Sequence, residues 1–233
     1  MKAVFDHSHS EAENIKTFYF RPERPAQYTA GQFAEWTMKH PKPDSRGQKR
    51  WFTISSSPNQ EFVTITTKFA DKPSSFKQAL NNLKQGDEIL MSDPMGDFVL
   101  PKLVQTPLVF VAGGIGITPF HSILSWLSDT KETRPITLIY GVNNEDEIIF
   151  TETFEKAGIV PKIVVSNPSS AWGGERGDLT GEMILGLAQP SDEALVYVSG
   201  PEPMVEKLQK ELKDAGLRKD RFVGDFFPNY TTI

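Results

Sequence analysis

The spacing of apolar residues changes about a hundred residues into the chain. After the loop at 100–107, apolar runs alternate with segments of helical periodicity. The runs are Leu108–Ala112, Ile136–Tyr140, Ile163–Ser166, Leu195–Ser199 and Arg221–Asp225, and the helical segments begin near Thr118, Glu147, Thr180 and Pro201. Buried strands that alternate with helices predict a doubly wound α/β domain with a five-stranded parallel sheet.

The residues before this change form a pattern of short strands separated by turn formers. The candidate strands are Asn14–Phe20, Gln32–Met38, Trp51–Ser55, Phe62–Phe69 and Glu88–Met91. Regularly spaced short strands between Pro-rich turns predict a small antiparallel β-barrel. We therefore expect a two-domain α+β protein, with the barrel at residues 1–103 and the α/β domain at residues 104–233.

One helical segment interrupts the barrel pattern. Ser74 or Ser75 is expected to cap this helix, and Gly86 to end it. Its apolar face consists of Phe76, Ala79, Leu80 and Leu83. Such a helix covers an open barrel end, and its N-terminus attracts anions.

The composition excludes several kinds of protein. Lys and Arg number 25 against 30 Asp and Glu, and this net charge of −5 disfavours a general nucleic-acid binder. Cysteine is absent, which excludes Cys-ligated iron–sulfur clusters and zinc sites. The histidines at 7, 9, 40 and 121 lack metal-ligand spacing, so no metal is expected. No apolar stretch reaches the roughly 20 residues that span a bilayer and no signal peptide is recognisable, so we expect a soluble, cytoplasmic protein.

A glycine-rich segment joins the first strand of the α/β half to its first helix. Gly113, Gly114 and Gly116 remove side chains where the chain turns sharply and where a pyrophosphate can approach backbone N–H groups. Thr118 is expected to cap the helix, and Pro119 suits its first turn. The spacing differs from Gly-x-Gly-x-x-Gly, so a turn that needs glycine for its geometry alone is the alternative.

Three segments taken together resemble the ferredoxin–NADP reductase superfamily. They are Arg50-Trp51-Phe52-Thr53, Gly113-Gly-Ile-Gly-Ile-Thr-Pro119 and Ser199-Gly-Pro-Glu-Pro-Met204. The family has an Arg-x-Tyr-Ser/Thr flavin motif, a Gly-Gly-x-Gly-x-Thr-Pro nucleotide loop and a Cys-Gly-Pro-x-Pro-Met segment near the nicotinamide. The likeness in order and spacing covers nearly the whole chain. It implies a flavin-binding barrel followed by a nucleotide-binding α/β domain.

The resemblance assigns the flavin contacts to the barrel half. It implies that Arg50 pairs with a flavin phosphate, that Phe52 packs on the isoalloxazine ring and that Thr53 places its hydroxyl near the N5 atom that receives hydride. The other implied contacts on the two strands are Ile54, Ser55, Thr67 and Lys68. From the residues alone, a solvated basic cluster at Arg50 and ordinary barrel positions for Phe52 and Thr53 are the alternatives.

The segment Lys72-Pro-Ser-Ser-Phe76 stands where the family has a Gly-x-x-Ser loop that holds the flavin pyrophosphate. Ser74 and Ser75 are the implied contacts, and a plain helix cap is their alternative. The glycine of the family's loop is missing here. FAD is the expected cofactor, with FMN as the second choice.

The remaining implied contacts surround the nicotinamide dinucleotide. They are Gly113, Gly114, Gly116, Thr118 and Pro119 on the glycine segment, and Gly200, Pro201 and Met204 beyond the fourth strand. Ser199 replaces the family's Cys and keeps a hydroxyl for the nicotinamide. Phe227, with Tyr230 as the second choice, is expected to cover the flavin face that the nicotinamide reaches. An aromatic residue in a disordered terminus is the alternative.

The segment after the second α/β strand bears on the choice of nucleotide. Asn143, Asn144, Glu145 and Asp146 follow that strand, and the carboxylates repel a 2′-phosphate. NADH is therefore favoured over NADPH. Arg176, in a nearby loop, keeps NADPH open.

These expectations describe an NAD(P)H-dependent flavoprotein reductase. Hydride would pass from NADH to bound FAD, and electrons would then pass to a ferredoxin, a flavodoxin, a haem protein or a membrane subunit. Exposed Lys and Arg residues at 39, 42, 46, 49 and 72 suit either an acidic carrier or simple solvation. The alternatives are a free-flavin or quinone reductase, and a flavin-binding regulatory or assembly module without turnover.

Overall fold

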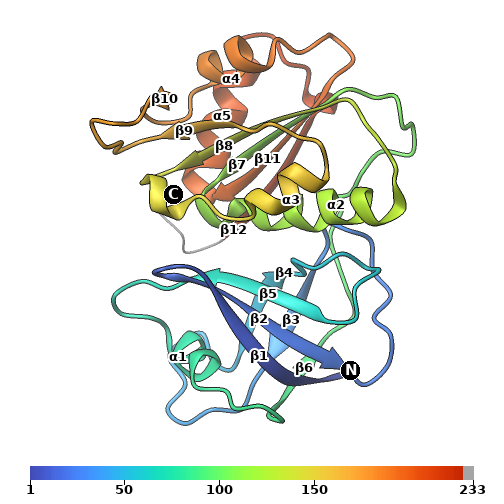
Figure 1. Cartoon of the computed structure of the whole chain (residues 1–233), viewed down its shortest axis with the longest axis vertical. Helices are drawn as coiled ribbons and strands as arrows, with labels where there is room; N and C mark the ends of the chain where they lie inside the picture. Colours follow the sequence, from blue (N-terminus) through green and yellow to red (C-terminus); the bar gives the residue numbers. More distant parts are fainter. Residues whose placement is uncertain (228–233) are drawn as a thin grey trace.

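Two six-stranded sheets, one in each half of the chain, form the frame of the computed structural model, which describes residues 1–227 (Figure 1). The N-terminal sheet is antiparallel, with strand order β4-β3-β6-β1-β2-β5. Its strands are β1 (Lys2–Ala12), β2 (Ile15–Pro22), β3 (Phe33–Thr37), β4 (Lys49–Thr53), β5 (Val63–Lys68) and β6 (Glu88–Met91). Just beyond β4, the Ser55 N–H donates to the Thr64 carbonyl at 3.0 Å, which joins the two edges into a barrel.

Strand β1 has no counterpart among the predicted strands. Its first residues alternate between buried and more exposed positions, but residues 7–10 are all exposed. The apolar alternation therefore covers only part of the strand. β1 forms because β2 and β6 supply hydrogen bonds on both of its sides, which is a tertiary effect rather than a local preference.

Helix α1 (Ser75–Asn81) packs on the barrel as predicted. Phe76 and Leu80 are fully buried in the barrel core, and Ser74 caps the helix by accepting a hydrogen bond in its first turn. The helix ends sooner than predicted, because the backbone leaves the helical conformation at Asn82. Gly86 lies in the following turn with a φ of 95°, a conformation that favours glycine.

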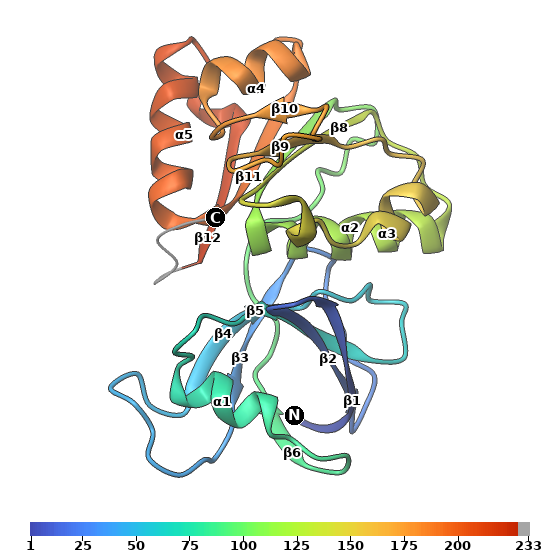
Figure 2. The same ribbon diagram turned by 60° about the vertical axis from the view of Figure 1, so that its left-hand side comes forward.

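The C-terminal sheet is parallel, with strand order β10-β9-β8-β7-β11-β12. Its strands are β7 (Leu108–Gly113), β8 (Ile136–Val142), β9 (Lys162–Val165), β10 (Glu175–Arg176), β11 (Leu195–Pro201) and β12 (Phe222–Phe227), and its helices are α2 (Ile117–Thr130), α3 (Thr151–Lys156), α4 (Gly181–Ala188) and α5 (Glu202–Asp214). Helices α2 and α3 pack on one face and α4 and α5 on the other (Figure 2). The predicted two-domain fold class is confirmed, and β10 adds a two-residue edge strand to the five predicted ones.

Two helices of this half begin at residues other than those predicted. Helix α2 follows directly on a 3₁₀ turn over Gly114–Gly116, with Gly116 at its N-cap, so the prediction that Thr118 caps it is wrong. The Thr118 hydroxyl instead donates to a carbonyl of that turn at 3.0 Å. Helix α3 begins at Thr151, because residues 145–147 form a 3₁₀ turn of their own.

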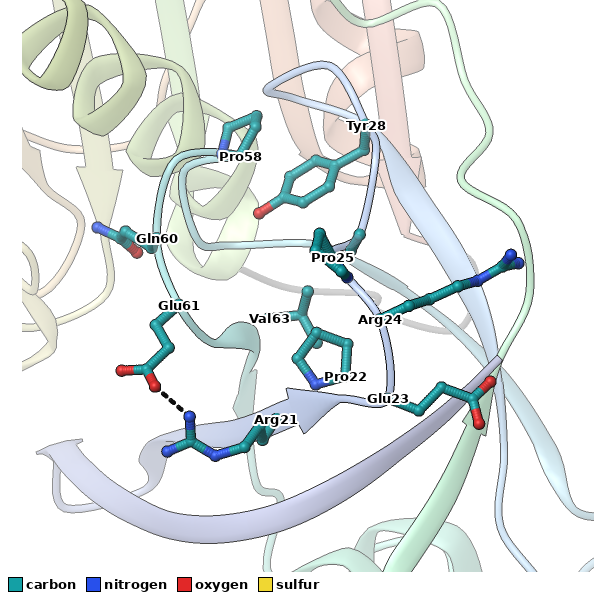
Figure 3. A pocket seen from close by; sticks show the side chains of 11 residues that line it. Arg21, Pro22, Glu23, Arg24, Pro25, Tyr28, Pro58, Gln60, Glu61 and Val63 are labelled. Atoms are coloured by element: carbon teal, nitrogen blue, oxygen red, sulfur yellow. Dashed lines mark hydrogen bonds and ion pairs between the residues drawn. The ribbon is translucent and has the colours of Figure 1, made fainter.

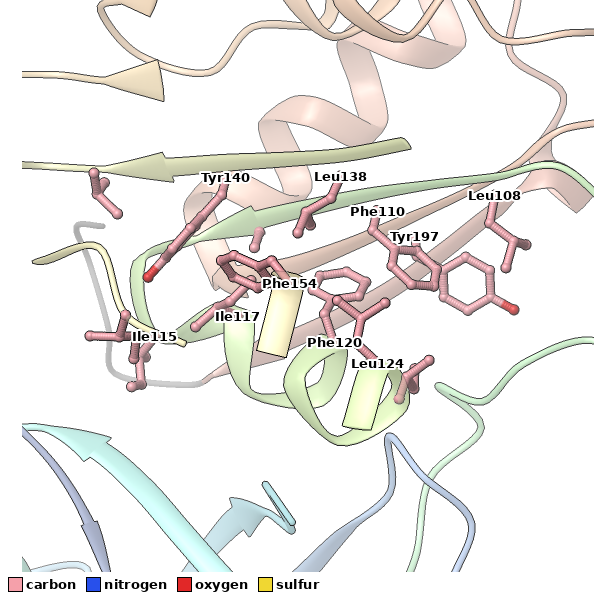
Figure 4. Close-up of a cluster of buried hydrophobic side chains, with 14 of the residues drawn as sticks. Leu108, Phe110, Ile115, Ile117, Phe120, Leu124, Leu138, Tyr140, Phe154 and Tyr197 are labelled. Atoms are coloured by element: carbon pink, nitrogen blue, oxygen red, sulfur yellow. The ribbon is translucent and has the colours of Figure 1, made fainter. Parts of the chain in front are cut away.

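A hydrophobic core anchors the segment between β6 and β7 to the α/β half. The ring of Phe98 lies 5.3 Å from that of Phe120 and 5.1 Å from that of Tyr197, centre to centre. The Tyr197 hydroxyl donates to the Val99 carbonyl at 2.8 Å. Figure 4 shows Phe120 and Tyr197 between α2 and the sheet. The predicted boundary near Leu103 falls within this connecting segment.

Candidate functional site

The parallel sheet reverses its winding between the neighbouring strands β7 and β11. From β7 the chain proceeds through α2 to β8 on one side, and from β11 it proceeds through α5 to β12 on the other. In open α/β sheets, ligands bind beyond the carboxyl ends of the strands at such a reversal. Gly113 ends β7 and Ser199 lies near the end of β11, so both predicted residues sit at this point.

The glycine segment is packed tightly against the end of β11. A Cβ atom at Gly116 would lie 2.2 Å from the carbonyl oxygen of Ser199, and one at Gly113 would lie 2.3 Å from the sulfur of Met204. A side chain at Gly116 would collide with backbone, whereas one at Gly113 would require the flexible Met204 side chain to move. The turn therefore brings bare backbone to the sheet reversal, and Met204 supports it from α5.

An acidic residue that the sequence analysis did not single out lies beside Ser199. Asp225 on β12 is the register partner of Ser199, and the Ser199 hydroxyl donates to its carboxylate at 3.4 Å. Burial of the Asp225 carboxyl raises its pKa to about 6, although the hydrogen bond from Ser199 acts in the opposite direction. A carboxylate in an otherwise apolar final strand is the signal that could have identified it.

Replacing Asp225 with Asn is expected to alter the pH dependence of stability. The Asp225 carboxyl has a pKa of 3.8 in the unfolded chain and of about 6 in the folded chain. Between pH 4 and pH 7 the unfolded chain therefore binds fewer protons, and the free energy of unfolding falls as the pH rises. The wild type should therefore lose about 2 kcal/mol of unfolding free energy relative to Asp225→Asn over this range. Urea titrations at several pH values measure the difference, and parallel curves for the two proteins would contradict it.

The aromatic residues expected over the flavin lie at the end of β12. Phe227 is the register partner of Pro201, is half-buried and packs against the core that contains α2. Tyr230 lies outside the described residues. β12 runs toward the barrel half (Figure 2), and Phe227 is its last residue.

Thr53, the last residue of β4, is buried, yet its hydroxyl makes no hydrogen bond within residues 1–227. The neighbouring hydroxyls differ, because Ser55 bonds to Thr64 at 2.8 Å and to Thr66 at 2.9 Å. The backbone N–H groups of Ile54 and Ser55 are also engaged, with carbonyls at 3.0 Å. Among the predicted contacts of this strand, the Thr53 hydroxyl is thus available to a ligand.

The segment that follows Thr53 contacts helix α2. The Ser122 hydroxyl donates to the Ser56 carbonyl at 2.6 Å, and the Tyr28 hydroxyl forms a hydrogen bond with the Ser56 hydroxyl at 2.9 Å. In addition, β5 packs against the Gly114–Gly116 turn. The flavin motif and the glycine turn are therefore held near one another by direct contacts between the two halves.

Lys68, predicted to lie beside the flavin phosphates, forms an ion pair with the α/β half. Its Nζ contacts both carboxylate oxygens of Glu147 at 2.8 Å, and only 19% and 10% of the two side chains are exposed. The Lys68 carbonyl accepts a hydrogen bond from Lys77 at 2.5 Å. Thr67, beside Lys68 on β5, is buried. The ion pair ties the end of β5 to the segment after β8.

Arg50 is held by the loop that precedes it. Its guanidinium donates to both carboxylate oxygens of Asp44, at 2.8 and 2.9 Å, and Asp44 also accepts the Ser75 N–H at 3.1 Å. Burial alone would raise the Asp44 pKa, but hydrogen bonds from Arg46, Arg50 and Ser75 lower it to about 2. Arg50 and Ser75, each predicted to contact a flavin phosphate, thus share one carboxylate of the chain.

Phe52, which is expected to pack on the isoalloxazine ring, contacts helix α1. Its half-buried ring lies 5.8 Å from that of Phe76 on α1.

The segment after β8, which bears on the choice of nucleotide, contacts the loop around 169–172. Glu145 accepts the Ser169 N–H at 2.9 Å, and Arg176 donates to the Ser169 carbonyl at 3.2 Å. The Arg176 guanidinium is therefore engaged by the loop around 169–172.

A pocket of about 390 Å³ lies on another part of the barrel (Figure 3). Its lining includes Arg21, Pro25, Tyr28, Pro58 and Glu61, with an ion pair between Arg21 and Glu61. None of the predicted site residues that the structure describes lines it. Within residues 1–227, no group of three or more His, Asp or Glu side chains is arranged to hold a metal ion, and no helix is both long and apolar enough to cross a membrane.

Comparison with known proteins assigns this geometry to a family. Residues 110–210 match the family model of the oxidoreductase NAD-binding domain. The chain is 31% identical over 228 residues to the stachydrine N-demethylase reductase subunit Stc4 of Rhizobium meliloti, covering 93% of this chain and 64% of the relative. It is 27% identical over 246 residues to flavohemoprotein A of Dictyostelium discoideum, covering 99% and 61%.

Solved structures share the whole fold. The FAD/NAD-binding domain of nitric oxide dioxygenase from Vibrio cholerae O1 biovar El Tor superposes with a TM-score of 0.82 at 22% identity, covering 97% of this chain and 98% of that one. A ferredoxin–NADP⁺ reductase from Neisseria gonorrhoeae gives 0.79 at 19% identity, with the same coverage.

A barrel followed by a parallel NAD-binding sheet defines a class of two-domain oxidoreductases. The chain shares the two-domain fold of ferredoxin–NADP⁺ reductase, and its residues 110–210 match the oxidoreductase NAD-binding domain family. It spans 61% and 64% of the length of the Dictyostelium and Rhizobium relatives, and 58% of the NADH oxidoreductase HCR of Escherichia coli.

Proposed function

We propose that this chain is an NADH-dependent flavoprotein reductase that passes electrons to a separate carrier protein. The observation that carries the proposal is the contact of the glycine turn with Ser199 at the sheet reversal, where β5 of the barrel also packs against this turn. A nucleotide bound at the reversal would have its nicotinamide end near the barrel. This arrangement suits transfer between two molecules held at contact distance.

The residues present fit a flavin ring against the end of β4. Thr53 is a buried residue whose hydroxyl has no hydrogen bond within residues 1–227, and the Phe52 ring is only half-buried. A bound FAD, or FMN as the alternative, would supply the capacity to accept hydride and release single electrons.

The chain's own groups align and shield the reactants. Gly113, Gly114 and Gly116 let the dinucleotide approach the backbone, with Thr118 and Pro119 opening the helix behind them. Ser199, held by Asp225, presents a hydroxyl to the nicotinamide. Gly200, Pro201 and Met204 would complete the floor of this site, and Phe227 would lie over a bound flavin.

The choice of NADH rests on the charge around the segment after β8. Glu145 and Asp146 are acidic, and the nearby Arg176 is held by backbone carbonyls of its own loop. A 2′-phosphate there would face carboxylates without a free cation from Arg176. NADPH should therefore reduce the protein more slowly than NADH.

The carrier that we propose is a protein that takes electrons singly, such as a ferredoxin, a flavodoxin or a haem protein. The names of two relatives describe reductase subunits, of stachydrine N-demethylase and of glycine betaine monooxygenase. These 233 residues contain no cysteine, so a thiolate-ligated iron–sulfur centre must reside elsewhere. We place the protein in the cytoplasm, which cell fractionation would test.

Anaerobic mixing with NADH is expected to bleach the absorbance of the flavin-loaded protein. NADPH, mixed under the same conditions, serves as the matched reductant. A spectrum that NADH leaves unchanged would contradict the proposal and favour a regulatory or assembly role. Flavin that is lost on dialysis but is turned over in excess NADH would favour the free-flavin reductase instead.

A further inference from the structure

The guanidinium of Arg50 is engaged almost completely by the loop at residues 40–49. One terminal nitrogen donates to both oxygens of Asp44, and the other donates to carbonyls of Arg46, Gly47 and Lys49 at 3.0, 3.1 and 2.7 Å. The Arg50 side chain is 11% exposed. Its Nε is buried and has no partner in the described part of the chain.

Contacts within the loop and with Ser75 hold the Asp44 carboxylate against the Arg50 guanidinium. The backbone N–H of Asp44 donates to the Ser75 hydroxyl at 2.9 Å, and the Ser75 N–H donates back to the carboxylate. The ring of His40 bonds to the same hydroxyl at 3.0 Å. These contacts hold both the backbone N–H and the carboxylate of Asp44, so its pairing with Arg50 is part of the folded loop.

We infer that Asp44 is an internal anion that competes with the flavin phosphate for Arg50, and so sets how strongly the protein distinguishes phosphorylated flavins from riboflavin. The inference rests on the proposed flavin site. A guanidinium recognises carboxylate and phosphate through the same planar pair of N–H donors. Arg50 cannot offer these donors to both anions at once, and two anions held side by side repel each other.

Binding of a phosphorylated flavin therefore requires Asp44 to give up Arg50. The contacts broken on release offset part of the attraction of Arg50 for the phosphate. Riboflavin has no phosphate and leaves the pair undisturbed. Removing the Asp44 charge should strengthen the binding of FMN and FAD selectively, whereas a purely structural role of Asp44 predicts weaker binding.

The first test compares flavin affinities of the protein freed of its cofactor. Quenching of flavin fluorescence gives the dissociation constants of riboflavin, FMN and FAD for wild type, Asp44→Asn and Asp44→Ser. The expected result is about tenfold tighter binding of FMN and FAD in both variants, with riboflavin changed less than about twofold. Asp71→Asn is the matched control, because Asp71 is exposed on the loop before α1 and makes no hydrogen bond or ion pair within residues 1–227.

A second test needs no flavin. Millimolar pyrophosphate should raise the thermal unfolding midpoint of Asp44→Asn and Asp44→Ser more than that of the wild type, and it should lose this effect when Arg50→Gln is added. If pyrophosphate raises the unfolding midpoint of the Asp44 variants more than that of the wild type, but no variant binds flavin, the competition is supported and the proposed function is contradicted. Flavin binding with no gain, or a loss, for FMN in both Asp44 variants would overturn the competition and leave the function standing.

Discussion

Replacing Gly116 with Ala is expected to lower the free energy of unfolding by about 3 kcal/mol and to lower the rate at which NADH reduces the flavin-loaded protein. Gly116 has φ −60° and ψ −6°, which alanine adopts without strain. The cost therefore comes from space alone, since the new Cβ would lie 2.2 Å from the Ser199 carbonyl oxygen. That oxygen belongs to backbone and cannot move aside as a flexible side chain can.

Gly186→Ala is the matched control for this prediction. Gly186 is exposed within α4, and a Cβ there would have no atom within 4 Å. Alanine is the better helix former, so this variant should gain about 0.5–1 kcal/mol. Urea denaturation gives both values, and stopped-flow bleaching with NADH gives the rates. Equal stability of Gly116→Ala and the wild type would mean that the turn is looser than the contact with Ser199 implies.

Replacing Thr53 with Ala is expected to slow NADH-dependent bleaching by at least about tenfold, while flavin stays bound. Thr53 is a buried residue of the flavin motif, and its hydroxyl makes no hydrogen bond within the described chain. A hydrogen bond from it to the reacting end of the ring would be lost in the alanine variant. Thr53→Ser retains the hydroxyl and should retain most of the rate.

The control for Thr53 is Thr37→Ala, at the far end of the neighbouring strand β3. Thr37 pairs in register with Lys49, whereas Thr53 pairs with Phe33 at the other end of the same two strands. The Thr37 variant makes the same chemical change in the same sheet and should bleach at the wild-type rate. Wild-type rates in Thr53→Ala itself would remove this hydroxyl from the reaction.

Local patterns were sufficient for the two-domain fold class and for most of its strands and helices. Apolar runs separated by helical periodicity predicted the parallel sheet, because strands buried on both faces carry few polar residues. The same patterns failed at β1, where four consecutive residues are exposed, and at α2, where the turn Gly114–Gly116 is already helical in character before Thr118. Pairing with β2 and β6 decides the structure at β1, and close packing of the turn against β11 decides it at α2.

The sequence by itself determined the two-domain architecture and the glycine turn between the first strand and first helix of the α/β half, since these depend on spacing along the chain. Only the tertiary structure decided the partners of the charged residues. Lys68 pairs with Glu147 from the other half, Ser199 with Asp225, and Arg50 with Asp44. The physical reason is that a charge takes whichever counter-ion the fold brings within about 4 Å, and sequence distance does not reveal that neighbour.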